Sequence, residues 1–259
     1  MPSSKPRRAV LVTGAATGIG AACARRFVKE GWHVAINCLD ASQRERAREI
    51  AAGATAEGQK AIVLEGDVSR DPDCVGLVEQ AVGVFGRLDA LVNAAGISKM
   101  VPLADLHGLD AEDFQRIYAV NTIGVFQMSR AAAPHLKATG DGAIVNITSR
   151  AGKAGGGSSI AYAASKGASN TLTLTLAKVL APEVRVNAVC PALVEGGFVE
   201  RLAPESFADR AQRQIDISPL KRLGKPDEVA ESVWWLVTSA GMMTGQLLDL
   251  DFGIHLTSG

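Results

Sequence analysis

The most regular feature of the sequence is an alternation of short apolar runs with longer segments of helical periodicity. Each run is nearly continuous in Val, Ile, Leu and Ala, which is typical of strands covered on both faces in a parallel sheet. The runs are Ala9–Val12, Val34–Ile36, Ala61–Leu64, Ala90–Val92, Ala143–Ile147, Val184–Val189 and Gln246–Leu250.

The segments between the runs are long enough to cross back over a sheet as helices. They are Ile19–Glu30, Ser42–Glu57, Pro72–Phe85, Ala111–Leu136, Ser158–Leu180 and Pro226–Ser239. This alternation predicts a doubly wound α/β fold, a three-layer α/β/α sandwich around a seven-stranded parallel sheet. Because no linker or internal repeat interrupts it, we expect a single domain over residues 1–259.

Two stretches fit neither kind of element. Residues 149–157 contain four glycines, and residues 192–218 have sparse strand character with a short helix predicted near 206–216. Both stretches follow predicted strands, and in open α/β sheets ligands bind beyond the carboxyl ends of the strands. We therefore expect residues 192–218 to form a substrate lid.

Composition and charge exclude several classes of protein. The 27 basic side chains equal the 27 acidic ones, whereas binding to nucleic acid or to anionic membranes usually requires a basic excess. The four cysteines lie far apart, which favours neither a zinc site nor a disulfide framework, and we expect no metal. The run Ala9–Val12 is too short for a signal-peptide core or a membrane span, so we expect a cytoplasmic protein.

The first apolar run ends in a glycine-rich turn, residues 13–20, and a helix is predicted to follow directly. Such glycines let backbone N–H groups approach a pyrophosphate, and the helix N-terminus adds partial positive charge. The alternative is a tight turn that only needs flexible residues. The spacing Gly-x-x-x-Gly-x-Gly differs from the commonest dinucleotide fingerprint, and the Lys-Ser/Thr pair of a Walker loop is missing.

Two later features fit a dinucleotide. Asp67 follows the third run, where a carboxylate can accept a hydrogen bond from an adenine amino group. Residues 93–96 close the fourth run with small side chains that permit close backbone approach. The alternative for both features is ordinary punctuation at the end of a strand.

Candidate chemistry lies in the segment 158–180. Tyr162 and Lys166 are four residues apart and therefore share one helix face. A nearby ammonium favours the phenolate, which moves the pKa of the tyrosine toward working pH for proton exchange with a carbonyl or alcohol. Ser149, at the end of a predicted strand, can hydrogen-bond the substrate oxygen. The alternative is a surface Tyr and Lys that are one turn apart by chance.

In this combination the sequence resembles the single-domain branch of the short-chain dehydrogenase/reductases, over residues 8–253. It is similar to 3-oxoacyl (acyl carrier protein) reductases and related ketoreductases. The matching pieces are Thr13-Gly14-x-x-x-Gly18-x-Gly20, Asp67-Val68, Asn93-Ala94-Ala95-Gly96, Asn121, Ser149, Tyr162-x-x-x-Lys166, Asn187-Ala188-Val189-Cys190-Pro191 and Asp251-Phe252-Gly253. Each motif is weak alone, but their order and spacing are specific. The resemblance implies a Rossmann-type fold and an NAD(P)(H)-dependent oxidoreductase (EC 1.1.1.-) that interconverts a ketone and a secondary alcohol.

The resemblance also implies roles for individual residues. Tyr162 would be the acid–base residue, and Ser149 would orient and polarise the substrate oxygen. Lys166 would bind the nicotinamide ribose and lower the pKa of Tyr162, while Asn121 would hold a water that connects Lys166 to solvent. The residues assigned to the cofactor are Gly14, Thr17, Gly18, Ile19, Gly20, Leu39, Asp67, Val68, Asn93, Ala94, Gly96, Tyr162, Lys166, Pro191 and Val194.

By the resemblance, residues at the end of the second run determine the choice between NAD(H) and NADP(H). The acidic residue that NAD-preferring relatives carry is replaced by Cys38, and the basic markers of NADP-preferring relatives are replaced by Leu39 and Thr17. NADP(H) is slightly favoured, because no carboxylate at Cys38 repels a 2′-phosphate. NAD(H) stays possible, because Asp40 can restore that preference. Three arginines follow a few residues later, and they are either ligands of the 2′-phosphate or part of a solvent-exposed helix face. They are Arg44, Arg46 and Arg48.

Residues 191–196 depart from the family pattern. Relatives usually have a Thr where Gly196 stands, and that Thr bonds the cofactor carboxamide, so this contact is in doubt; the Val194 backbone can still serve. Gly196 and Gly197 predict a mobile lid. Arg150 and Lys153 suggest an acidic substrate, but contact with solvent or a neighbouring subunit is the favoured reading.

Two other functions stay open on this scaffold: a non-catalytic nucleotide-binding regulator, and an epimerase or dehydratase that recycles its cofactor. The four catalytic candidates together argue against the regulator, and relatives that catalyse the other reactions are generally longer. The expected partner is a small ketone or alcohol, with no nucleic acid or membrane. Relatives imply a homotetramer packed through residues 111–136, 158–180 and the C-terminal strand.

Overall fold

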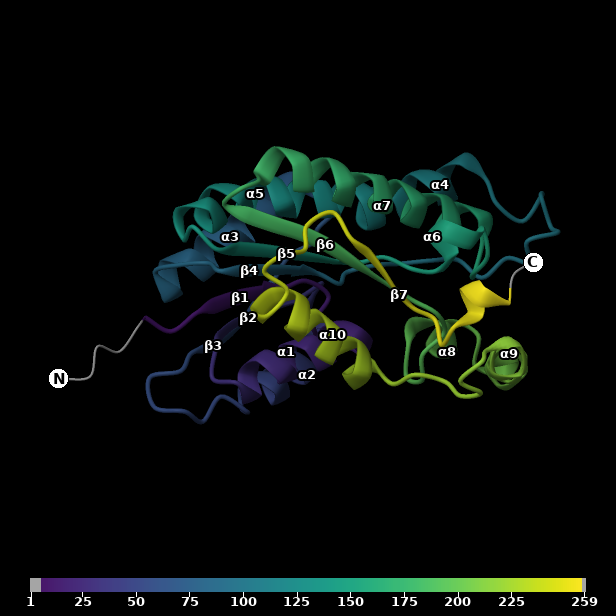
Figure 1. Ribbon diagram of the computed structural model, residues 1–259, viewed down its shortest axis with the longest axis horizontal. Coiled ribbons are helices and arrows are strands. Elements are labelled where there is room, and N and C mark those ends of the chain that lie inside the picture. The colour runs from purple at the N-terminus through teal and green to yellow at the C-terminus, as the bar shows by residue number, and fades with distance from the viewer. Residues whose placement is uncertain (1–5, 258–259) are drawn as a thin grey trace.

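In the computed structural model, which describes residues 6–257, seven parallel strands form one sheet in the order β3-β2-β1-β4-β5-β6-β7 (Figure 1). The strands are β1 (Ala9–Val12), β2 (His33–Cys38), β3 (Ala61–Glu65), β4 (Ala90–Asn93), β5 (Gly142–Ile147), β6 (Val184–Pro191) and β7 (Leu247–Leu250). The predicted seven-stranded sheet is confirmed, and the first and last residues of each predicted run differ from those of its strand by at most two positions. The ends of the predicted domain, 1–5 and 258–259, lie outside the described residues.

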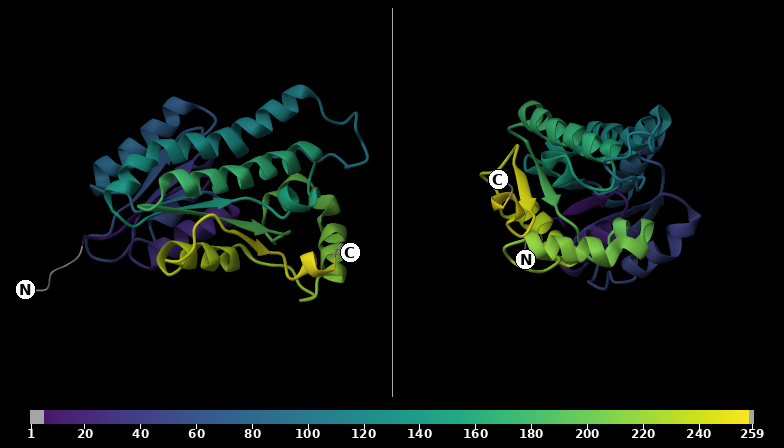
Figure 2. Two further views of the ribbon diagram at one scale, coloured as in Figure 1. Left: turned by 45° about the horizontal axis from the view of Figure 1, so that its top comes forward. Right: turned by 90° about the vertical axis from the view of Figure 1, so that its right-hand side faces the viewer.

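Helices cover both faces of the sheet, as the views in Figures 1 and 2 show. One face carries α3 (Asp71–Phe85), α4 (Ala111–Tyr118), α5 (Val125–Ala138) and α7 (Ile160–Leu180). The other carries α1 (Gly18–Lys29), α2 (Arg44–Ala51) and α10 (Pro226–Thr238). This is the three-layer sandwich that the alternation predicted. None of the helices within residues 6–257 is long and apolar enough to cross a membrane.

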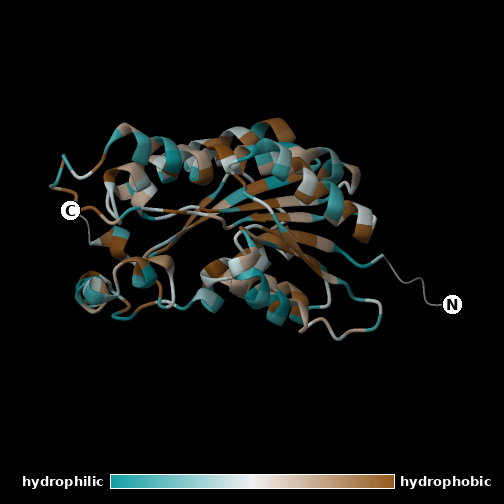
Figure 3. Cartoon of the chain, turned by 180° about the vertical axis from the view of Figure 1, so that it is seen from behind, coloured by the Kyte–Doolittle hydropathy of each residue, from teal (hydrophilic) through white to brown (hydrophobic). Residues whose placement is uncertain are grey.

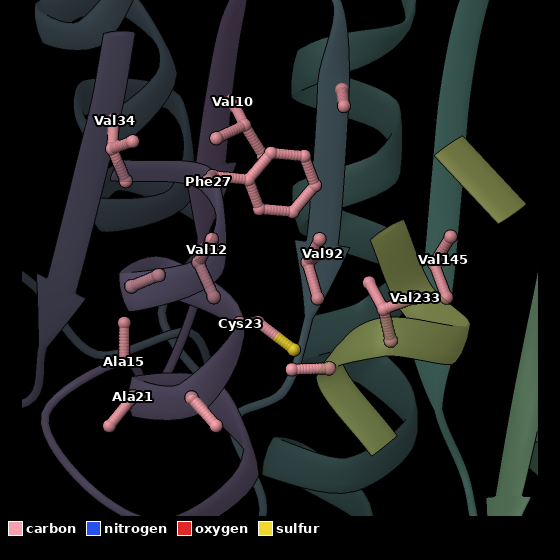
Figure 4. Close-up of a cluster of buried hydrophobic side chains, with 14 of the residues drawn as sticks. Val10, Val12, Ala15, Ala21, Cys23, Phe27, Val34, Val92, Val145 and Val233 are labelled. Carbon is pink, nitrogen blue, oxygen red and sulfur yellow. The ribbon is translucent and has the colours of Figure 1, made fainter. Parts of the chain in front are cut away.

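Each face of the sheet has its own apolar core. On the side of α1 and α10, Phe27, Cys23 and Val233 pack against strand residues such as Val10 and Val92 (Figure 4). On the opposite side, side chains of α3, α5 and α7 pack against the other face of the same strands. Strands buried on both faces explain why the runs are continuously apolar. Figure 3 shows mostly hydrophobic strands between helices in which hydrophilic and hydrophobic residues are mixed.

Two predicted helices differ from the structure. The predicted helix 42–57 is shorter: a 3-10 turn, η1 (Ala41–Gln43), precedes α2, which ends at Ala51 before turns at Gly53 and Gly58. The predicted helix 111–136 contains a π-helical segment, η2 (Ala119–Gly124), between α4 and α5. A Cβ on Gly124 would stand 2.9 Å from the Val68 backbone oxygen, so only glycine permits this close approach. π-Helical segments are frequent at functional sites.

The two irregular stretches lie beyond the carboxyl ends of β5 and β6. The first contains the four-residue helix α6 (Ala151–Ala154). The second contains α8 (Phe198–Leu202) and α9 (Pro204–Ile217), so the predicted short helix near 206–216 is confirmed and is slightly longer. In Figure 1 both α8 and α9 lie at the end of the sheet where β6 finishes.

Candidate active site

A cavity of about 510 Å³ lies beyond the carboxyl ends of the central strands. The turn after β1 lines one part of it. The segments that follow β4, β5 and β6, the start of α7, and the helices α8 and α9 line the rest. Ten predicted site residues meet there: Gly18, Ile19, Gly20, Ala94, Gly96, Ser149, Tyr162, Lys166, Pro191 and Val194. The topology therefore gathers residues from five separate segments into one site, at the position where doubly wound sheets bind ligands.

The hydroxyls of Tyr162 and Ser149 face each other in this cavity. Ser159 begins α7 by accepting a hydrogen bond from the Tyr162 backbone N–H at 3.2 Å, which places Tyr162 in the first turn. The Tyr162 hydroxyl is hydrogen-bonded to the Ser149 side chain. Phe198, the first residue of α8, packs edge-on against the ring with centroids 5.4 Å apart. Only 6% of Tyr162 is exposed.

Lys166 lies one turn further along α7, with its ammonium buried beside Tyr162. Its Nζ donates to the Ile147 carbonyl at 2.8 Å and lies 5.8 Å from the centroid of the Tyr162 ring. Burial lowers the pKa of Lys166 to about 8. The predicted juxtaposition on one helix face is present, and the ammonium is held by a strand carbonyl as well.

The pKa of Tyr162 moves opposite to the predicted direction. Burial raises it to about 12, and the hydrogen bond from Ser149 lowers it by less than burial raises it. Desolvation penalises the charged phenolate, and here it is the larger effect. The chain by itself therefore keeps the Tyr162 hydroxyl protonated at neutral pH.

The glycine turn after β1 serves two purposes. A Cβ on Gly20 would stand 2.4 Å from the Gly14 carbonyl oxygen, and one on Gly14 would stand 2.7 Å from the Ala95 Cα, so both glycines are required by the packing of the chain itself. Gly18 has φ +56° and no atom closer than 3.9 Å to its added Cβ. That glycine leaves open space on the cavity side.

The same turn fits the pyrophosphate of a dinucleotide. Within the described residues, the Thr17 side chain makes no capping hydrogen bond to α1, and the first turn of α1 contains no acidic residue. The N–H groups at the start of α1 therefore have no side-chain acceptor, and they line the cavity together with the open space at Gly18. An anion is the natural partner of a helix N-terminus in this condition.

Comparison with known proteins agrees with this geometry. The family model described as Enoyl-(Acyl carrier protein) reductase matches residues 14–255. A protein from Streptomyces violaceoruber, described as a ketoacyl reductase of the granaticin polyketide synthase, is 41% identical over 95% of both chains. The crystal structure of a short-chain dehydrogenase/reductase from Burkholderia xenovorans superposes with a TM-score of 0.89 at 41% identity, over 98% of this chain and 100% of that one.

The chain belongs to the short-chain dehydrogenase/reductase family. It is therefore an oxidoreductase of a family that uses NAD(P). A further relative is cis-4-hydroxycyclohexanecarboxylate dehydrogenase from Sinomonas cyclohexanicum, which is 36% identical over 95% of this chain and 96% of its own. The resemblance inferred from the motifs is confirmed.

Asn121 is not among the residues that line the cavity, and its predicted role of holding a water stays a prediction. Its side-chain oxygen accepts from the Ile97 N–H, and its side-chain amide donates to the Ile97 carbonyl, both at 2.9 Å, and to the Ser165 hydroxyl at 3.0 Å. Both ends of the amide are thus occupied by the chain. Asn121 joins η2 to the segment after β4 and to α7, which positions Gly96 and Lys166.

Five of the residues assigned to the cofactor lie away from the cavity. Val68 is buried against Gly124, and Leu39 is 49% exposed after β2. The Asp67 carboxylate accepts from the Ser69 N–H at 2.9 Å. The other two are Gly14 and Thr17, in the turn after β1. Whether these residues contact the cofactor stays a prediction.

Asn93, the sixth cofactor candidate outside the cavity, is turned into the protein. Its amide donates to the Asn146 side-chain oxygen at 2.9 Å and to the Ser129 hydroxyl at 3.3 Å. Because these partners lie on β5 and α5, the side chain links neighbouring elements beneath the site. Its side-chain amide is thus occupied by the protein core, and whether Asn93 contacts the cofactor stays a prediction.

Sequence reasoning missed Asn37, the buried polar residue in β2. Its oxygen accepts from the Gly14 N–H at 3.1 Å, and its amide donates to the Cys38 and Gly66 carbonyls at 3.1 and 3.0 Å. Asn37 therefore ties the glycine turn to the ends of β2 and β3. The available signal was a lone amide in an otherwise apolar strand, since buried polar groups require partners.

Arg150 and Lys153 are paired within the chain. Arg150 lies 3.6 Å from the buried Asp251 carboxylate, and Lys153 lies 2.5 Å from Asp249. These ion pairs join the segment after β5 to β7 and its extension. The two cations that suggested an acidic substrate thus have carboxylate partners of their own.

Proposed function

We propose that the chain interconverts a ketone and a secondary alcohol by hydride transfer with NADP(H) or NAD(H), with Tyr162 as the acid–base residue. One observation carries the proposal: the Tyr162 hydroxyl is hydrogen-bonded to Ser149 in the same cavity that the uncapped N-terminus of α1 lines. A proton donor, a second hydroxyl and an anion site therefore share one site. General acid–base chemistry requires this proximity.

Each side chain has a definite part in such a reaction. The glycine turn after β1 would hold the nicotinamide cofactor, which would supply or take up the hydride. The Ser149 and Tyr162 hydroxyls donate hydrogen bonds to the ketone oxygen, which stabilises the negative charge that develops there. Tyr162 then gives its proton to that oxygen. Phe198 covers the tyrosine ring and excludes water from it.

The two pKa shifts suit ketone reduction near neutral pH. Tyr162, with a pKa raised to about 12, holds its proton and can donate it. Lys166, with a pKa lowered to about 8, is still mostly charged at pH 7 and stabilises the phenolate left behind. In the oxidative direction the phenolate has to form first, so that direction should gain rate as pH rises.

We propose NADP(H) as the preferred cofactor, because of the charged side chains near the place where the adenosine half of the cofactor would bind. Two of the three predicted arginines are neutralised, since Arg44 pairs with Glu65 and Arg48 with Glu45. Asp40 is occupied by Ser42, whose N–H and hydroxyl donate to its carboxylate. Because Arg44 and Arg48 are paired, Arg46 is the arginine we propose to contact the 2′-phosphate. Because Ser42 occupies its carboxylate, Asp40 is a poor ligand for the ribose.

Arg46 has a cationic neighbour from the lid. The Arg201 Nη1 lies 3.9 Å from the point where a Gly18 Cβ would stand, and it donates to the Gly196 carbonyl at 3.0 Å. Burial and the nearby charge of Arg46 both lower the pKa of Arg201. Two like charges held at one place are stabilised by a phosphate between them.

The names of relatives support the reaction type. Ketoacyl reductase and hydroxycyclohexanecarboxylate dehydrogenase both denote interconversion of a ketone and a secondary alcohol.

A homotetramer is also proposed, because α5, η2 and α7 expose large apolar side chains that a neighbouring copy can cover. They are Ile123, Phe126, Leu174 and Val179.

Replacing the Tyr162 hydroxyl tests the proposal. Tyr162→Phe should lower kcat for ketone reduction by about 10²–10⁴-fold, because the proton donor is lost. The dissociation constant for NADPH, measured by cofactor fluorescence, should change little. Tyr118→Phe, at the only other tyrosine, is the matched control and should keep full turnover. Near-normal turnover of Tyr162→Phe would falsify the mechanism.

A further inference from the structure

The charges that line the cavity are of one sign. Its charged lining residues are Arg150, Lys166, Arg210 and Arg213, and no Asp or Glu among the described residues lines it. The whole chain is neutral, with 27 cations and 27 anions. A cavity with only cations is therefore a local arrangement and does not follow from the composition.

Two of these cations already have partners. Arg150 lies beside the Asp251 carboxylate, and the Lys166 ammonium donates to the Ile147 carbonyl. Arg210 uses its Nε to bond the neutral Ser206 hydroxyl at 3.3 Å. Within residues 6–257, neither Arg210 nor Arg213 forms an ion pair.

The lid helix is fixed with these arginines toward the cavity. Residues 210, 213, 214 and 217 recur at helical spacing on one face of α9, and all four line the cavity. The Gln214 side chain locks the rotation of that face. Its amide donates to the Leu193 carbonyl at 2.9 Å, and its oxygen accepts from the Leu193 N–H at 2.8 Å.

We infer that Arg210 and Arg213 bind an anionic group of the substrate, a carboxylate or a phosphate ester, carried on the same molecule as the ketone. The inference rests on the proposed function, because it places the ketone at Tyr162. Guanidinium groups present forked donors that match either anion. The apolar neighbours Phe198 and Ile217 line the cavity too and suit a hydrocarbon link between the ketone and the anion.

Ketones with the same three-carbon link and either an anionic or a neutral end group test the inference. The probes are 5-oxohexanoate and 4-oxopentyl phosphate, each compared with the neutral 5-oxohexanamide. With the wild-type enzyme and NADPH, at least one anionic ketone should exceed the amide in kcat/KM by roughly tenfold. The anionic ketone with the larger gain in kcat/KM over the amide identifies the anionic group, carboxylate or phosphate ester, that the site binds. Equal or better use of the amide against both anions overturns the inference while leaving ketone reduction intact.

Variants locate the effect. Arg213→Gln should remove most of the anion's advantage through KM, and Arg213→Lys should restore part of it. Lys178→Gln removes an exposed cation of α7 outside the cavity and should leave the preference unchanged. If Arg213→Gln instead weakens NADPH binding and slows charged and neutral ketones alike, the arginine serves the cofactor and the inference is wrong.

A binding measurement separates this inference from the proposed reaction. Calorimetry with the Tyr162→Phe enzyme and NADPH measures the affinity of each probe without turnover. The anionic probes should bind roughly tenfold more tightly than the amide, and the difference should shrink in added salt. If no ketone is reduced but the anions still bind preferentially, the proposed reaction fails and the anion site stands. If the anions show no preference, the anion site fails.

Discussion

The two ends of the cavity are built in different ways. At the proposed cofactor end, backbone atoms meet at the ends of strands, and glycines such as Gly14 and Gly20 are required because neighbouring backbone leaves no room for a Cβ. At the proposed substrate end, side chains of α9, the helix proposed as part of a lid, line the cavity, and α9 is anchored through Gln214 to Leu193. The cofactor end is thus fixed by the sheet, whereas the substrate end depends on how a lid helix docks.

The largest expected effect tests how rigid the cofactor end is. Gly20→Ala should lower the free energy of unfolding by about 3 kcal/mol, because its Cβ would stand 2.4 Å from the Gly14 carbonyl oxygen. Gly18→Ala should cost only about 1 kcal/mol, the penalty for φ +56°, and should weaken NADPH binding. Urea unfolding and cofactor titration measure both effects.

Gly140→Ala is the control for Gly18. Gly140 has φ +73° with nothing within 4 Å of an added Cβ, and it lies outside the cavity. The variant should show the same small loss of stability with unchanged NADPH binding. Equal stability of Gly20→Ala and Gly18→Ala would mean that the turn can shift, and that the cofactor end is not rigid.

The next effect concerns Lys166, which lies between the two ends. In the unfolded chain Lys166 keeps its proton up to about pH 10.5, whereas in the folded chain it keeps the proton only up to about pH 8. Between these pH values the unfolded state therefore binds more protons than the folded state, and the free energy of unfolding rises with pH. Below pH 8 the burial penalty is fully present. Lys166→Met should therefore be about 2 kcal/mol more stable than wild type at pH 7, after allowing for the lost hydrogen bond to Ile147.

Unfolding measured at pH 7 and at pH 10 checks this sign. The advantage of Lys166→Met should shrink at the higher pH, because the wild-type lysine then folds neutral and its burial penalty is smaller. Lys178→Met provides the exposed control, since Lys178 lies on the same helix at the surface. A difference between Lys166→Met and wild type that is the same at both pH values would contradict the lowered pKa.

The smallest effect concerns the adenosine end, where side chains of the lid and of α2 meet the rigid turn. Arg46→Gln should raise the dissociation constant for NADPH roughly fivefold and leave that for NADH unchanged, because one exposed charge contact to the 2′-phosphate is lost. Arg48→Gln, whose arginine pairs with Glu45, should change neither. Tighter binding of NADH than of NADPH by the wild type would overturn the proposed preference.

The same contrast explains how far the sequence predicted the molecule. The strands were found because burial on both faces makes them continuously apolar, and the juxtaposition of Tyr162 and Lys166 was found because helical spacing is local. Several of the family's other motifs, such as the glycine turn and residues 93–96, lie at strand ends, where topology alone brings them together. The confirmed seven-stranded sheet follows from these local signals.

The features that were missed or reversed depend on tertiary contacts. The pKa of Tyr162 rises because the residue is buried, in part under Phe198 from the lid, and spacing within α7 does not contain that information. Arg213 faces the cavity because Gln214 docks α9 on Leu193. Asn37 was missed because three of its four partners lie far away in the sequence, in the glycine turn and at the end of β3, and only Cys38 is a neighbour.

The most direct test of the central claim follows the hydride itself. The enzyme is given NADPH that carries deuterium at the transferable position of nicotinamide C4, together with the best ketone of the probe set, and the product is analysed by mass spectrometry and NMR. The account predicts a secondary alcohol with deuterium on the carbinol carbon, formed in step with cofactor oxidation and nearly abolished in Tyr162→Phe. A product without deuterium, or a converted ketone with no net cofactor oxidation, would contradict it.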